Sequence, residues 1–313
     1  MTQPSAIIGA GLAGLIAGYS FPGVPIFEAA PRGAAPHRAL LRFRSDAVSR
    51  LTGIPFRKVR VRKGIWSDGA FRAPDVRLAN LYARKCLDRV VGERSIWSME
   101  PVDRWVAPES LIEQMTEASI SRIAFGLPYD FTDSRAAQPV ISTAPLALAL
   151  DALALAPTEK PTLARAPIWT RRYRVPLADA HQTVYFPDHS MSTYRASITG
   201  DLLILGLRND LEADDVMTEL AQVCNAMGLD DEEIDPIDAS EQRYGKIIPL
   251  GDDERRGWLA QLTIRAGIYS LGRFATWRNV LLDDVVMDAE VIRRMLRSSG
   301  ATNFHALRAS AGR

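Results

Sequence analysis

The sequence predicts an α/β protein: a Rossmann-type dinucleotide-binding domain into which a smaller α+β domain is inserted. Three observations predict this fold class. A glycine-rich turn follows a short apolar run at the N-terminus, and an acidic residue ends the next apolar run. A strand-like segment near the C-terminus ends in Gly-Arg, which indicates that the chain returns to its first domain.

The N-terminal segment from Ile7 to Glu28 predicts a βαβ unit that holds an ADP group. An apolar run ends at Ile8 and leads into the loop Gly9 to Gly14, which opens an apolar helix. The first glycine permits a tight turn, the second lets the backbone approach a pyrophosphate, and the third lets helix and strand pack closely. Glu28 follows Gly9 by 19 residues and can accept both hydroxyls of a ribose.

The C-terminal segment favours FAD over NAD as the dinucleotide. Gly267 to Arg273 predicts a strand, and Asp283 to Leu296 predicts a helix whose first turn could face a flavin ring. FAD proteins of the glutathione-reductase type begin in the nucleotide domain and return to it in this way. The predicted cofactor-binding residues are Gly9, Gly11, Leu12, Ala13, Gly14, Glu28, Arg42, Arg44, Ser45, Thr143, Gly272, Arg273 and Asp284.

Several of these residues come from two intermediate segments. A dense set of cations, His37 to Asp46, follows the ribose-binding strand and predicts either contacts with the FAD diphosphate and flavin or a solvated face. The apolar run 139–145 ends in small residues and proline, which predicts a buried strand that allows close backbone approach.

The remaining segments predict the inserted domain and its connections. We expect a hairpin from Phe56 to Phe71, helices at 78–91, 108–120 and 214–228, a linker at 157–167, a strand-rich block at 169–207 and an exposed acidic connection at 230–238. The predicted FAD-binding domain comprises 1–52, 108–150 and 243–313, and the predicted substrate domain comprises 53–107 and 151–242. The basic positions 57–63 of the hairpin suit either a phosphate backbone or solvent.

Composition limits the remaining function classes. The 313 residues are 47% hydrophobic and carry a formal charge of +1, which supports a packed core and argues against a generally basic nucleic-acid binder. Two cysteines without metal-ligand spacing predict no disulfide framework and no metal site, and they fit a reducing cytoplasm. No stretch approaches the roughly 20 apolar residues that a membrane span needs, so we expect no membrane association.

The order of these segments resembles UDP-galactopyranose mutase and the wider amine-oxidase-like flavoproteins. The likeness covers most of the chain, and it rests on the glycine motif, Glu28, the segment 43–46, the strand 140–145, the pairs at 185–188 and 194–195, the Pro249 turn and Gly272-Arg273. In that family the arginine at the Arg195 position holds an anionic group of the substrate. The family's active-site tyrosines fall here on Asn279, Val280, Ile247 and Ile248, which argues against a sugar-nucleotide mutase.

The runs 42–66 and 269–277 look more closely like small flavoproteins of tailed bacteriophages, some of which belong to pathways that hypermodify thymidine in DNA. That resemblance implies an amine oxidase that converts a glycinyl-thymidine into 5-aminomethyl-deoxyuridine and glyoxylate, in the host cytoplasm, with dioxygen as electron acceptor. The implied partner is modified DNA or a small amine. The predicted substrate-binding residues are Arg195, Tyr185, Tyr194, Trp277 and Arg278.

No general base stands out, and Lys246 and His37 are the candidates. Two alternatives stay open: a flavin-dependent sugar-nucleotide isomerase resembling the mutase, and a non-catalytic FAD-binding accessory protein. The oligomeric state is not predicted.

Overall fold

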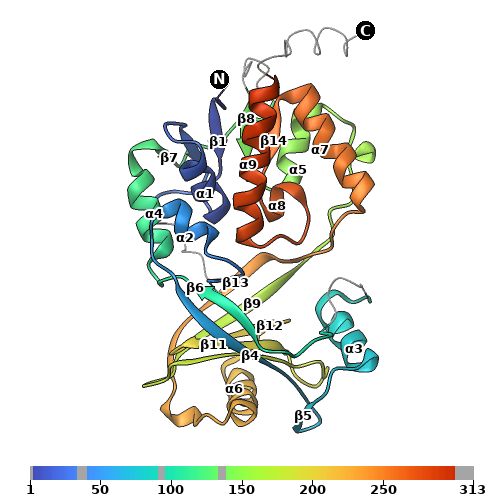
Figure 1. Cartoon of the computed structure of the whole chain (residues 1–313). Coiled ribbons are helices and arrows are strands. Elements are labelled where there is room, and N and C mark those ends of the chain that lie inside the picture. The colour runs from blue at the N-terminus through green and yellow to red at the C-terminus, as the bar shows by residue number, and fades with distance from the viewer. Residues whose placement is uncertain (1–2, 34–40, 91–95, 133–138, 300–313) are drawn as a thin grey trace.

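The computed structural model describes residues 3–33, 41–90, 96–132 and 139–299. Two sheets organise this part of the chain, one of five strands in the order β14-β8-β1-β2-β7 and one of nine strands in the order β13-β9-β12-β11-β10-β4-β6-β3, with β5 on β4. In Figure 1 the smaller sheet and its helices form the upper body, and the larger sheet lies below it. Strand β1 and helix α9, from opposite ends of the chain, lie together in the upper body.

The five-stranded sheet is parallel throughout. β1 (Ala6–Ile8) pairs with β2 (Ile26–Glu28) on one side and with β8 (Val140–Ser142) on the other, and β7 (Ile123–Phe125) and β14 (Ile268–Ser270) form the edges. Because all five strands point the same way, their carboxyl ends meet at one edge of the sheet, where ligands of open α/β sheets bind. The predicted return of the chain near its C-terminus is therefore confirmed by β14.

Helices cover both faces of this sheet. α1 (Leu12–Ser20) packs against α2 (Ala47–Thr52), α4 (Leu111–Ser119) and α9 (Leu282–Ser299) over a core that includes Ile7, Leu15 and Ala289. α5 (Leu146–Ala149), α7 (Asp252–Ala266) and α8 (Arg273–Thr276) cover the opposite face. The sequence does not predict α7, because the buried residues of this helix are few and its charges are spread over several of its faces.

The nine-stranded sheet is mixed and curves beneath the first. Its long strands are β4 (Arg57–Ser67), β9 (Arg165–Arg174), β11 (Thr193–Gly200) and β13 (Asp235–Ile247). The shorter strands are β3 (Arg42–Phe43), β5 (Ala70–Arg72), β6 (Val102–Val106), β10 (Ala180–Tyr185) and β12 (Leu202–Leu207). α6 (Ala213–Met227) packs on one face through Leu220 and Val223, whereas α3 (Val76–Leu87) packs near the aromatic side chains of the other. The predicted hairpin is confirmed as β4 and β5.

Two expectations need correction. Helix α3 begins at Val76 instead of residue 78, because Asp75 caps it by accepting a hydrogen bond from the Leu78 N–H at 2.7 Å. It ends at Leu87 instead of residue 91, because Asp88 takes a left-handed conformation. The acidic stretch 230–238 is not wholly a connection, since β13 begins at Asp235. Asp238 accepts two hydrogen bonds from Arg172 on β9, at 2.6 and 2.8 Å, and this cross-strand pair makes an acid acceptable in a strand.

The predicted domain division stays a prediction, and two strands do not follow it. β3 lies within the range 1–52 but joins the larger sheet, and β13 crosses the predicted boundary at 242 and 243. Among the described residues, every helix is too short or too polar to cross a bilayer.

Candidate functional site

A cavity of about 560 Å³ opens at the carboxyl end of the five-stranded sheet. Its walls come from the glycine loop, from the end of β2, from the residues after β8 and from the C-terminal segment, and they include Gly11, Glu28, Thr143, Arg42, Arg273 and Val285. The lining is mainly apolar with a few polar groups, as in many cofactor sites. Segments far apart in the sequence therefore build one site.

The three glycines of the loop have different roles. A Cβ on Gly14 would lie 1.8 Å from the Gly9 carbonyl oxygen, and a Cβ on Gly9 would lie 2.6 Å from Thr143 Oγ1. Gly9 also has a φ of +93°, which favours glycine. A Cβ on Gly11, by contrast, would meet nothing within 4 Å, and Gly11 lines the cavity. Gly9 and Gly14 are thus required by the fold, whereas Gly11 leaves space that a ligand can fill.

Glu28 and Thr143 fix the loop from its two sides. The Glu28 carboxylate accepts hydrogen bonds from the N–H groups of Ala10 at 2.7 Å and Ala30 at 2.9 Å. The Thr143 hydroxyl donates to the Ile8 carbonyl at 2.7 Å. Both side chains still line the cavity, so the predicted ribose acceptor lies beside the predicted pyrophosphate loop.

The C-terminal return contacts the glycine loop directly. Gly272 has a φ of +90°, and a Cβ there would lie 2.8 Å from the Cβ of Ala13. The guanidinium of Arg273 donates to the Gly245 carbonyl at 3.1 Å and lines the cavity beside Phe274. The structure therefore brings Gly9, Gly11, Ala13, Gly272 and Arg273 together as predicted from the sequence.

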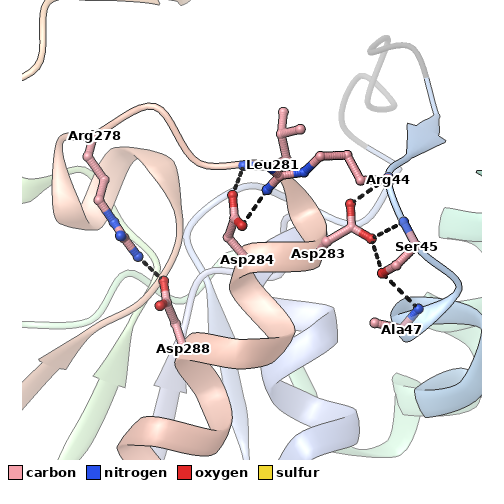
Figure 2. Close-up of polar contacts among 8 residues, drawn as sticks. All are labelled: Arg44, Ser45, Ala47, Arg278, Leu281, Asp283, Asp284 and Asp288. Carbon is pink, nitrogen blue, oxygen red and sulfur yellow. Dashed lines mark hydrogen bonds and ion pairs between the residues drawn. The ribbon is translucent and has the colours of Figure 1, made fainter. Parts of the chain in front are cut away.

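Arg44, Ser45 and Asp284, predicted to bind the cofactor, are engaged with α9 instead. Figure 2 shows Asp283, at the start of α9, accepting hydrogen bonds from the Arg44 N–H at 2.9 Å, the Ser45 N–H at 3.0 Å and the Ser45 hydroxyl at 2.7 Å. The Arg44 guanidinium pairs with Asp284, which also accepts from the Leu281 N–H at 2.8 Å. These contacts hold the segment after β3 against α9, and the three residues do not line the cavity.

Arg42 lines the cavity but is bonded to the larger sheet. Its guanidinium donates to Thr183 Oγ1 at 2.9 Å, to the Gln182 carbonyl at 3.3 Å and to the Ile198 carbonyl. Burial, together with the nearby charge of Arg195, lowers the pKa of Arg42 to about 10. Arg42 therefore stays cationic at neutral pH and links the cavity to β10 and β11.

The predicted substrate residues divide into two groups. Tyr185 and Arg195 are cross-strand partners on β10 and β11, and Tyr194 is adjacent to them. Tyr82 of α3, which the sequence analysis missed, lies with its ring centroid 5.5 Å from that of Tyr185 and 6.4 Å from that of Tyr194. The sequence gives little sign of a functional role for Tyr82, because a tyrosine on the apolar side of an amphipathic helix is expected for packing alone.

Trp277 and Arg278 do not join this group, so the structure corrects that expectation. Trp277 is 1% exposed, and its indole N–H donates to the Ile248 carbonyl at 3.0 Å. Arg278 pairs with Asp288 of α9 (Figure 2). Both side chains therefore bond to residues of the upper body and not to the tyrosine group.

Of the two candidate bases, Lys246 is 7% exposed, and its Nζ lies 4.1 Å from the ring centroid of Tyr194. The cation thus belongs to the tyrosine group on the larger sheet. His37 lies outside the described residues.

The basic positions of the hairpin face both sides of the sheet. Arg57 pairs with Asp179 at 2.7 Å, and Lys58 and Arg60 both pair with Asp103, at 3.1 and 2.9 Å. Arg62 is exposed, whereas Lys63 is partly buried. The hairpin is therefore less uniformly basic than its sequence indicates.

The sequence matches no protein-family model and no curated protein. Solved structures do match. Reduced UDP-galactopyranose mutase aligns with 98% of this chain and 99% of its own, with a TM-score of 0.61 and 14% identity. The chain shares that fold.

The same fold extends to a fatty acid isomerase from P. acnes that produces CLA, with a TM-score of 0.57, 13% identity, and coverage of 92% of this chain and 97% of the other. A redesigned putrescine oxidase aligns with a TM-score of 0.54 and 12% identity, over 95% of this chain and 99% of its own. These likenesses confirm the predicted fold class, an α/β protein with a Rossmann-type nucleotide-binding domain.

Proposed function

We propose that the protein is an FAD-dependent oxidoreductase that resembles amine oxidases. One observation carries this proposal: three features meet at the cavity at the carboxyl end of the five-stranded sheet. They are the open space beside Gly11, the carboxylate of Glu28 next to the glycine loop, and the contact of Gly272 with that loop from the other end of the chain. An ADP group fits this set, because backbone N–H groups at the start of α1 suit a pyrophosphate and a carboxylate suits ribose hydroxyls. The residues present therefore fit FAD.

The chain's own residues supply binding and orientation. FAD, when bound, supplies a two-electron acceptor for a hydride from substrate carbon. Arg195 is the residue that binds a substrate carboxylate, because its planar cation can make two parallel hydrogen bonds. Tyr185 and Tyr194 form an aromatic wall beside it, and Tyr82 packs against both rings.

The finer proposal is that the substrate is a glycinyl-modified thymidine in DNA. Loss of a hydride and a proton from its glycine CH–NH unit gives an imine, which water cleaves into an amine and glyoxylate. Dioxygen then takes the two electrons and leaves as hydrogen peroxide. The resemblance to phage flavoproteins supports this substrate. So does the position of Arg195 opposite Tyr185, because Tyr185 is partly exposed and its ring can stack on a base.

Anaerobic mixing of the FAD-loaded protein with amines tests the proposal. We expect glycinyl-thymidine DNA to bleach the oxidised flavin band, and the return of air to produce hydrogen peroxide in equal amount. If a small secondary amine bleached the band and the DNA did not, the proposed DNA substrate would be wrong, and the proposed oxidoreductase activity would stand. A band that no amine bleaches would overturn both.

That last outcome also separates the alternatives. A mutase would convert a nucleotide sugar only with reduced flavin and would consume no dioxygen. An accessory protein would convert no nucleotide sugar and would also consume no dioxygen. The residues at the family's tyrosine positions argue against the mutase, since Ile247 is buried and Val280 presents an aliphatic side chain to the cavity.

A further inference from the structure

The larger sheet has one face that we call the inner face, which carries Arg104, Lys63, Thr183, Tyr185 and Arg195. The strand registers place these residues together: Arg104 pairs with Val59 on β4, Lys63 pairs with Thr183, and Tyr185 pairs with Arg195. Since side chains alternate along a strand, Val59 and Lys63 lie on the same side of β4. Arg42 reaches this face through its hydrogen bond to Thr183.

Burial and neighbouring cations disfavour the charge of two inner residues, Arg42 and Lys63. Burial also opposes the charge of Arg195, but the tyrosines around it favour that charge, and the pKa of Arg195 is raised. Burial lowers the pKa of Arg42, and Arg195 and Arg104 lower it further. Burial also lowers the pKa of Lys63, as does Arg104, while Glu100 opposes them. In the described part of the chain, the leading charge interactions of Arg42 and Arg195 include no carboxylate. Positive charge at Arg42 and Lys63 therefore costs free energy, which a bound anion would offset.

The opposite face of the same strands is different. Lys58, Arg60 and Arg62 alternate with the inner residues of β4 and therefore point the other way. Asp103, which pairs with Arg60 in the strand register, forms ion pairs with both Lys58 and Arg60. Asp103 thus neutralises the outer cations Lys58 and Arg60. On the inner face, Arg57 has a carboxylate partner in Asp179.

We propose that Arg104 and Lys63 bind phosphate groups of the substrate and lead it past Arg42 to Arg195. This inference rests on the proposed function and adds to it the phosphate contacts of the substrate. Arg104, Lys63 and Arg195 belong to β6, β4 and β11, and β10 lies between β4 and β11. Three intervals of about 4.8 Å across these four strands make about 14 Å. A row of that length exceeds one carboxylate and suits a nucleotide or a short run of DNA strand.

Two adjacent residues of β4 allow a matched test, because Lys63 lies on the inner face and Arg62 on the outer. Binding of a fluorescein-labelled thymidine oligonucleotide to the FAD-loaded protein would be followed by fluorescence anisotropy at several salt concentrations. We expect Lys63→Gln and Arg104→Gln each to weaken binding several-fold and to reduce the salt slope by about 1. Arg62→Gln should leave the affinity and the salt slope unchanged, and Lys63→Arg, which keeps the charge, should bind as the wild type does.

The inference is overturned if the inner variants bind as the wild type does, or if Arg62→Gln weakens binding as much as Lys63→Gln. A wild-type affinity that does not depend on salt overturns it as well, without any variant. Competition by thymidine monophosphate assigns the contact to the substrate's own phosphate, and its absence assigns the contact to flanking phosphates.

Binding is measured without turnover, so the two proposals fail separately. Lys63-dependent binding without amine oxidation overturns the proposed reaction and keeps the phosphate contact. Oxidation of a small amine together with salt-independent DNA binding overturns the phosphate contact and keeps the proposed reaction.

Discussion

The carboxylate of Glu28 accepts a hydrogen bond from the backbone N–H of Ala10 at 2.7 Å, so the acid at the end of β2 touches the loop that follows β1. The same carboxylate lines the cavity. A group that binds at this point therefore meets the loop amides and the acid together. This contact gives the nucleotide assignment a direct test.

Glu28→Gln should weaken FAD binding by about 10- to 100-fold. Hydrogen bonds to a charged group contribute about 1.5–3 kcal/mol, and an amide cannot accept from two ribose hydroxyls as a carboxylate does. Titration of the apoprotein with FAD measures the dissociation constant. Glu113→Gln, on the first turn of α4, is the control that should bind normally. An unchanged FAD affinity in Glu28→Gln would show that the ribose lies elsewhere.

Gly11→Ala and Gly14→Ala should separate ligand binding from folding. Gly11 has a φ of −65° and open space at its Cβ, so alanine there should leave the apoprotein's melting temperature unchanged and reduce FAD affinity at least about tenfold. Gly14→Ala would press on the Gly9 carbonyl and destabilise the fold by about 1–3 kcal/mol. Yellow protein with normal FAD affinity from Gly11→Ala would contradict the cofactor assignment.

Arg195→Lys should raise KM for a carboxylate-bearing amine about tenfold, because an ammonium cannot form the two parallel hydrogen bonds of a guanidinium. An amine that lacks the carboxylate should be oxidised at the same rate by both forms. Steady-state peroxide formation with the two amines measures the difference. Equal losses with both substrates would place the role of Arg195 in the fold and not in carboxylate recognition.

Asp283→Ala should lower the free energy of unfolding by about 2–4 kcal/mol. Its nearly buried carboxylate accepts three hydrogen bonds from Arg44 and Ser45, and the two backbone N–H groups would lose their partner. Asp284→Ala should cost less, since its pair with Arg44 is partly exposed. Urea unfolding of both variants provides the comparison, and equal costs would refute the distinction.

Lys85 predicts a pH dependence of stability. Its ammonium donates to the carbonyls of Phe186, Asp188 and Thr193 at 2.7–2.8 Å, and burial lowers its pKa to about 8 from 10.5. Between these two values the unfolded chain holds a proton that the folded protein has released. The contribution of Lys85 to the free energy of unfolding therefore rises with pH, by up to about 1.4 kcal/mol per unit.

Lys85→Met removes that contribution and isolates it. The difference in unfolding free energy between wild type and variant should grow from about pH 8 to about 10.5 and stay flat below pH 8. Urea titrations across this range measure it. A difference that does not change with pH would mean that the three carbonyls hold the lysine charged throughout.

The sequence by itself determined the nucleotide site. Gly9, Gly11, Gly14 and Glu28 lie within one short segment, and their roles follow from local geometry: a left-handed turn, a close approach and an acid at a strand end. Gly272 joined them because a second glycine turn near the C-terminus is also a local signal. Such features need no knowledge of distant partners.

Only the tertiary structure decided where the charged side chains point. Arg42 lines the cavity as the sequence predicts, but its guanidinium bonds to β10 and β11. Arg44 pairs with Asp284 and Trp277 is buried, although the sequence placed both near a ligand. The partners of Arg42 and Arg44 are distant in the chain. Trp277 belongs to a core that forms only when α7 and α8 pack. The physical reason is that strand register and helix packing, which no local pattern specifies, select the partner of each charge.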